Sequence, residues 1–66
     1  MRIYVNSKET EAGDNATLQQ LIEQLGIGEK RVAIEVNTEL VIKNAWPTHV
    51  LHANDKVEIV SFVGGG

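Results

Sequence analysis

The chain has 66 residues, a net charge of -3 and a pI near 5.2, which leaves room for one small domain. Its 42% hydrophobic and 23% charged residues are typical of a packed globular chain rather than a disordered one. No block of like charge occurs, so a footprint for nucleic-acid phosphates is not expected. The lack of cysteine excludes disulfides, a thiolate nucleophile and cysteine-ligated metal sites.

Residues 2–6 alternate between polar and apolar, which predicts a strand with Ile3 and Val5 facing inward. This segment reaches polar residues too soon for a signal peptide, and no apolar run is long enough to span a membrane. We therefore expect a cytoplasmic protein that does not bind membranes.

The following segments predict the order β-β-α-β-β-turn-β. Thr17 and Gln20 form a capping-box pair that opens a helix, and Gly26 and Gly28 end it. The other predicted elements are an edge strand at 8–12, strands at 32–37 and 40–42, a helical turn beginning at 45–47 and a strand at 56–63. This order predicts an α+β domain with one helix across one face of a mixed sheet, and with Trp46 closing one end of the core.

Alternation also predicts which side chains face away from the helix. The inner face is expected to carry Ile3, Val5, Val32, Ile34, Val36, Val57 and Ile59, and the outer face Arg2, Tyr4, Glu35, Glu58, Val60 and Phe62. If the first and last strands are neighbours, Tyr4, Val60 and Phe62 cluster as a partner-docking face, the alternative being ordinary two-sided sheet packing. Glu35 and Glu58 would form an acidic rim for a basic partner, or serve solubility alone.

No catalytic constellation occurs in the sequence. His49, His52 and Asp55 are spaced three residues apart, but a metal site needs three or four convergent ligands, so we expect no metal. The carboxylates are spread along the chain without a focus for acid-base catalysis.

Three glycines, Gly64, Gly65 and Gly66, follow the last predicted strand directly and carry the final carboxylate about 10 Å beyond the sheet. Glycine adds no packing there, but its slim backbone can enter a narrow channel and leaves the carbonyl carbon open to attack. A frayed tail is the alternative. The domain is expected to span 1–63 and the flexible tail 64–66.

These residues resemble the ubiquitin-like sulfur carriers of the β-grasp fold, and most closely the ThiS-type carriers of thiamin biosynthesis. The resemblance covers the chain and is carried by residues 3–6, 17–18, Leu21, 25–26, 32–37, Trp46, Leu51, 55–60 and above all 63–66. The sequence departs from the family pattern at Ser7, at 42–44 and at Asn54, all in turns.

The resemblance implies a four- to five-stranded β-grasp sheet and a protein co-substrate rather than an enzyme. A ThiF-type adenylyltransferase would use ATP to adenylate Gly66, a sulfur donor protein would convert it to a thiocarboxylate, and thiazole synthase would receive the sulfur. Gly64 and Gly65 would enter the partner active sites, no cofactor would be bound, and the carrier would be a monomer.

Other readings remain open. The small subunit of molybdopterin synthase also ends in Gly-Gly, but that family generally is longer and has prolines near its end, where this chain has residues 61–63 without one. A protein modifier conjugated through Gly66 and a plain binding domain with an inert tail are the further alternatives.

Overall fold

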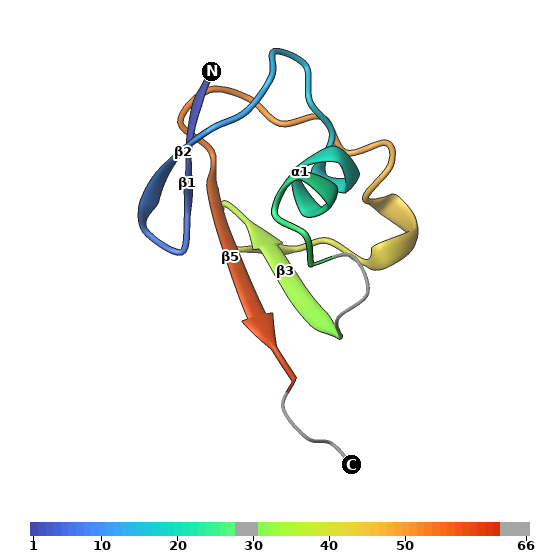
Figure 1. Cartoon of the computed structure of the whole chain (residues 1–66). Helices are drawn as coiled ribbons and strands as arrows, with labels where there is room; N and C mark the ends of the chain where they lie inside the picture. The colour runs from blue at the N-terminus through green and yellow to red at the C-terminus, as the bar shows by residue number, and fades with distance from the viewer. Residues whose placement is uncertain (28–30, 63–66) are drawn as a thin grey trace.

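The computed structural model describes residues 1–27 and 31–62, which form a five-stranded sheet with one α-helix against it (Figure 1). The elements are β1 (Arg2–Val5), β2 (Lys8–Glu11), α1 (Leu18–Gln24), β3 (Val32–Val36), β4 (Glu39–Leu40), the 3₁₀ helix η1 (Lys43–Ala45) and β5 (Lys56–Ser61). The strand order is β2-β1-β5-β3-β4, in which β1 and β5 are parallel and the other described neighbours antiparallel. The predicted mixed sheet is therefore confirmed.

Some predictions fall outside the described residues. They are the role of Gly28 in ending the helix, the extension of the last strand to Val63, and the tail at 64–66. The boundary placed after residue 63 belongs with them.

Both hairpins turn on pairs of residues with positive φ. Asn6 and Ser7 have φ values of 49° and 71°, and Asn37 and Thr38 have 51° and 74°. Turns with two such residues match the twist of the flanking strands, and asparagine tolerates this conformation better than most residues. Because Asn6 and Asn37 belong to the turns, β1 and β3 each end one residue earlier than predicted.

The helix begins and ends at the signals present in the sequence. The Thr17 side chain accepts a hydrogen bond from the Gln20 backbone N–H, and the Gln20 side chain accepts one from the Thr17 backbone N–H. At the other end Gly26 takes a φ of +71°, which glycine adopts cheaply. The Leu18 N–H donates to the His49 carbonyl at 2.8 Å, so the long connection before β5 holds the first turn.

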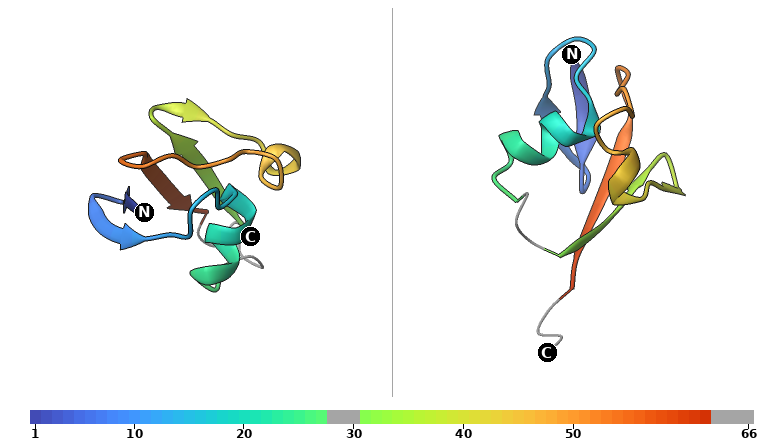
Figure 2. Two further views of the ribbon diagram at one scale, coloured as in Figure 1. Left: turned by 90° about the horizontal axis from the view of Figure 1, so that it is seen from above. Right: turned by 90° about the vertical axis from the view of Figure 1, so that its right-hand side faces the viewer.

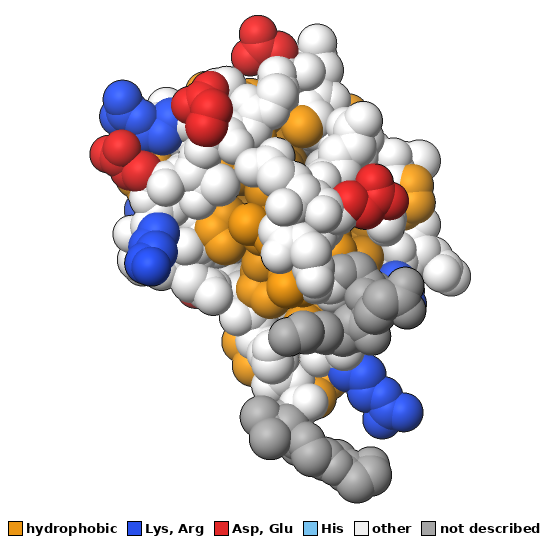
Figure 3. All heavy atoms as spheres, viewed as in Figure 1, with side chains coloured by type: hydrophobic (Ala, Val, Ile, Leu, Met, Phe, Trp, Pro, Cys, Tyr) orange, Lys and Arg blue, Asp and Glu red, His pale blue; other side chains and the backbone are white. Residues whose placement is uncertain are grey.

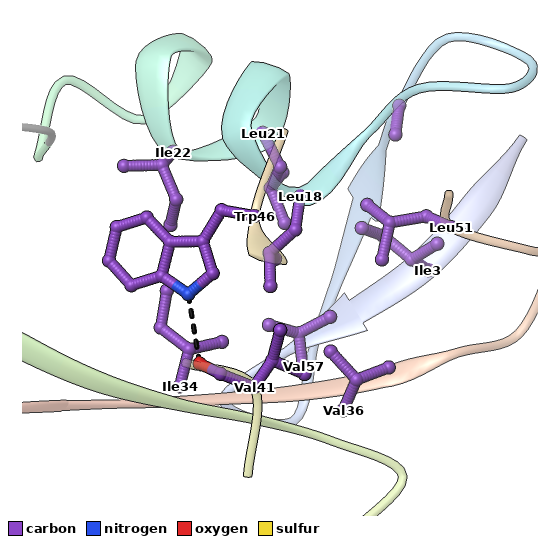
Figure 4. Close-up of a cluster of buried hydrophobic side chains, with 11 residues drawn as sticks. Ile3, Leu18, Leu21, Ile22, Ile34, Val36, Val41, Trp46, Leu51 and Val57 are labelled. Carbon is purple, nitrogen blue, oxygen red and sulfur yellow. Dashed lines mark hydrogen bonds between the residues drawn. The ribbon is translucent and has the colours of Figure 1, made fainter. Parts of the chain in front are cut away.

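The connection after β3 differs from the prediction. β4 ends at Leu40 instead of continuing to residue 42, and the 3₁₀ helix occupies 43–45 instead of beginning at Ala45. The reason is a buried hydrogen bond of 2.9 Å from the Trp46 indole N–H to the Val41 carbonyl, which draws both residues inward (Figure 4). Trp46 therefore lies in the core, as predicted.

The helix α1 lies against one face of the sheet (Figure 2), and the core fills the space between them (Figure 4). Ile3, Ile34 and Val57 from the three central strands are fully buried against the helix. The remaining buried apolar residues are Ala12, Leu18, Leu21, Ile22, Val36, Val41, Trp46 and Leu51. The predicted inward residues Val5, Val32 and Ile59 are partly buried and pack against this core.

Candidate functional site

The outer face of the sheet carries the residues predicted for it. In β5 the inward Val57 and Ile59 alternate with Glu58 and Val60, and Phe62 continues the outward series. Val60 and Phe62 are 58% and 61% exposed, although they are large apolar side chains. Such exposure on a small domain is typical of a surface that a partner covers.

The expected cluster of Tyr4, Val60 and Phe62 is wrong in one respect. β1 and β5 are neighbours, but β1 pairs only with the start of β5, where Tyr4 lies opposite Lys56. Phe62 comes six residues later, about 20 Å further along an extended strand. Val60 and Phe62 therefore form an apolar surface without Tyr4.

Tyr4 belongs instead to a hollow at the other end of the face. The hollow has a volume of about 280 Å³ and is lined by Tyr4, Ser7, Lys56 and Glu58. A hydrogen bond to Tyr4, together with the charge of a neighbouring carboxylate, raises the pKa of the Arg2 guanidinium. The side chains of Ser7, Lys56 and Glu58 thus share the hollow with the tyrosine.

Glu35 and Glu58 lie directly opposite each other on β3 and β5. Both side chains are exposed on the outer face. Like charges at directly opposed positions destabilise a sheet by a few tenths of a kcal/mol to about 1 kcal/mol. The acidic pair is therefore a feature that the packing of the sheet does not explain.

Sequence analysis missed an apolar residue on this face. Leu40 in β4 lies opposite Glu35 in the register and is 64% exposed. Continuing the alternation through residues 40–42, with Val41 inward, would have placed Leu40 outward. Leu40, Val60 and Phe62, together with Glu35 and Glu58, make up what we call the outer surface.

The end of β5 brings the chain out of the sheet. The Phe62 N–H donates to the Arg31 carbonyl at 3.0 Å, so pairing with the β3 side continues to residue 62. Figure 1 shows β5 running on well past the end of β1. The predicted cargo site Gly66 and the tail residues Gly64 and Gly65 lie outside the described residues.

The residues considered as metal ligands, His49, His52 and Asp55, take part in hydrogen bonds that hold the fold together. One carboxylate oxygen of the buried Asp55 accepts from the His52 backbone N–H at 2.8 Å, and the other accepts from the Asn37 side chain at 2.9 Å. The His49 carbonyl accepts from the first turn of α1. Among residues 1–27 and 31–62, no three His, Cys, Asp or Glu residues gather as a metal site would require.

Charged side chains on the face seen in Figure 3 are interspersed, with acidic and basic groups scattered around exposed apolar atoms. No single-sign patch is visible on that face. No helix in the described part of the chain is long and apolar enough to cross a bilayer.

Comparison with known families decides the assignment. The model of the ThiS family matches residues 1–66. The chain belongs to the ThiS family.

Individual ThiS-family relatives agree with this. The sulfur carrier protein ThiS of Bacillus subtilis is 34% identical over 65 residues, covering 97% of this chain and 98% of that protein. The crystal structure of the thiamine biosynthesis protein ThiS from Geobacter metallireducens superposes with a TM-score of 0.84 at 28% identity, covering all of both chains. The predicted β-grasp fold and the resemblance to the ThiS family are therefore confirmed.

A longer relative also matches. A protein named thiazole synthase from Paramagnetospirillum magneticum is 35% identical over 66 residues. The match covers the whole of this chain and only 20% of the length of that protein. In that relative, a ThiS-like segment is part of a polypeptide that bears the name of an enzyme.

Proposed function

We propose that the Gly66 carboxylate is the site at which this ThiS-family carrier holds sulfur for thiazole formation in thiamin biosynthesis. The supporting observation is the family match over residues 1–66, which includes the three glycines. A carboxylate is a poor electrophile, so a ThiF-type adenylyltransferase first joins it to AMP from ATP and releases pyrophosphate. A persulfide on a donor protein then attacks the carbonyl carbon and displaces AMP, which leaves an acyl disulfide between the carrier and the donor. A thiol reductant supplies two electrons to cleave the S–S bond, which leaves the thiocarboxylate on the carrier and a thiol on the donor.

Thiazole synthase is the proposed acceptor of this sulfur. The thiazole synthase of P. magneticum contains a segment similar to this whole chain, which supports a functional pairing of the two. Gly64 and Gly65 would pass through the narrow entrance of each partner because they lack side chains.

Intact-mass measurement tests the cargo site. The chain is incubated with ATP, a ThiF-type adenylyltransferase and a sulfur donor, beside a control variant that lacks Gly66. A mass increase equal to exchanging one oxygen for one sulfur, absent in the truncated control, is the expected result. An unchanged mass with an active enzyme would contradict the proposal, and an isopeptide adduct would favour a protein modifier. A thiocarboxylate used by molybdopterin synthase but not by thiazole synthase would favour the other sulfur-carrier pathway.

We propose that the partners dock on the outer surface. The exposed Val60 and Phe62 supply apolar area next to the point where the chain leaves the sheet. A basic side chain of the partner would offset the repulsion between the opposed Glu35 and Glu58. Tyr4 lies about 20 Å from Phe62 along the strand and would contribute through the hollow that it lines if the partner covers the whole face.

Phe62→Ser is the test of this surface. We expect an unchanged fold and weaker binding to the adenylyltransferase. Leu25→Ser is the matched control, because Leu25 is a partly exposed apolar residue at the end of α1, which covers the other face. Equal effects of the two substitutions on binding would contradict docking on the outer surface.

A further inference from the structure

The backbone of β5 offers hydrogen-bonding groups on two sides, and the contacts define which residues serve each side. Towards β3, the Phe62 N–H donates to the Arg31 carbonyl and the Asn37 N–H donates to the Lys56 carbonyl. In an antiparallel pair such contacts recur at every second residue. Residues 56, 58, 60 and 62 therefore direct their backbone groups to β3, and residues 57, 59 and 61 direct theirs to the side of β1.

On the β1 side, Asn6 forms hydrogen bonds with the backbone of both Val57 and Ile59. Its backbone N–H donates to the Val57 carbonyl at 2.8 Å. Its side-chain Oδ1 accepts from the Ile59 N–H at 2.7 Å, and its Nδ2 donates to the Ile59 carbonyl at 3.3 Å. The side-chain amide thus takes the place of one more strand residue after β1 has ended at Val5.

Ser61 is the next position in this series. The chain has already turned away at Asn6 and Ser7, and the register of β1 with β5 stops at Val57. Within residues 1–27 and 31–62, no hydrogen bond reaches the Ser61 N–H or carbonyl from the β1 side. Ser61 is exposed, and Figure 1 shows this last part of β5 extending beyond β1.

We propose that the activating enzyme contributes an extended segment that pairs with the backbone of β5 at Ser61, in line with β1. This inference rests on the proposed function. Strand addition at an open edge gives affinity through main-chain hydrogen bonds, and it does not need side chains on the residues that follow. That property suits this position, because residues 64–66 are all glycine.

The pairing also sets the reach of the chain end. Gly66 comes five residues after Ser61, which is at most about 18 Å of extended chain. A backbone contact at Ser61 fixes the starting point of that reach and so limits where the carboxylate can lie in the enzyme. A second copy of this chain is a poorer occupant of the edge, because each copy carries a net charge of -3.

Ser61→Pro tests the pairing because it removes the N–H on the open side. The Ser61 N–H takes no part in pairing with β3, and proline is tolerated at strand edges, so the fold should persist. Ser61→Ala is the matched control that alters the side chain and retains the N–H. For adenylation we expect KM for the Ser61→Pro carrier to rise about tenfold with kcat retained, the factor for one lost backbone hydrogen bond. Ser61→Ala should match the unmodified chain.

A second variant guards against a folding defect of the proline protein. In a synthetic chain, an ester in place of the amide at Ser61 removes the same N–H without the proline ring. Unchanged KM in a folded Ser61→Pro or ester variant would overturn the inference while leaving the proposed function intact. An unmodified chain that the enzyme does not adenylate would contradict both.

Amide exchange distinguishes the occupant. We expect the Ser61 amide of the free chain to exchange fast and to slow at least tenfold in the complex with the enzyme. Protection in the free chain that grows with concentration would assign the edge to a second copy and would overturn the inference.

Discussion

Replacing Asn6 separates the two contributions that this residue makes to stability. Its side chain forms two hydrogen bonds with the backbone of Ile59, and its φ of 49° lies in the left-handed region. Asn6→Gly keeps that conformation accessible and removes the hydrogen bonds. At about 0.5 to 1.5 kcal/mol net for each bond, we expect the two to contribute roughly 1 to 3 kcal/mol. Asn6→Ala adds roughly 1 kcal/mol for the left-handed backbone.

The assay is urea unfolding followed by the fluorescence of Trp46, which is buried and is the single tryptophan of the chain. The roughly 2 to 4 kcal/mol expected for Asn6→Ala is a large share of the roughly 5 kcal/mol at the lower end of ordinary stabilities, so the midpoint should shift clearly. Asn15 is the matched control, since it has a φ of 63° and no side-chain hydrogen bond within the described residues. Asn15→Gly should have little effect.

Two results would refute this reasoning. Equal losses for Asn6→Gly and Asn6→Ala would mean that the left-handed backbone contributes nothing. An Asn6→Gly midpoint equal to that of the unmodified chain would mean that the Asn6 amide does not hold β5.

Three further predictions concern charged groups. Asp55→Asn should lower the free energy of unfolding by about 1 to 3 kcal/mol. Both oxygens of this buried carboxylate accept hydrogen bonds, and an amide has one oxygen that can accept. Urea unfolding measures the loss, and an unchanged midpoint would contradict the prediction. A hydrogen bond from Glu11 raises the pKa of the Met1 ammonium above its ordinary value of 8.0, so its stabilising effect is complete below pH 8.0 and is lost as pH rises through the raised value. Acetylation of the N-terminus should abolish that pH dependence, and a persisting dependence would assign it elsewhere. Glu58→Gln should raise stability by a few tenths of a kcal/mol by ending the repulsion with Glu35 and should weaken enzyme binding in titrations; a stability loss would show that the repulsion is absent.

Local signals in the sequence determined the elements of this ThiS-family protein. Alternation identified Ile3, Ile34 and Val57 as inward, and a strand backbone allows no other arrangement once one side is buried. Thr17 and Gln20 marked the start of α1, because the capping box involves residues three apart and depends on nothing distant. The same alternation predicted the outward position of Glu35, Glu58, Val60 and Phe62. The resemblance to the family anticipated the β-grasp sheet.

The tertiary structure alone decided where those outward residues lie relative to one another. The register of β1 with β5 pairs segments more than 50 residues apart, and it places Tyr4 beside Lys56 rather than beside Phe62. The Trp46–Val41 hydrogen bond likewise moved the 3₁₀ helix, since the preference of a short segment is weaker than a buried contact. The open position at Ser61 exists because β1 is shorter than β5 and Asn6 replaces one further residue. Lengths and registers of paired strands are properties of the assembled sheet, and no periodicity within either strand encodes them.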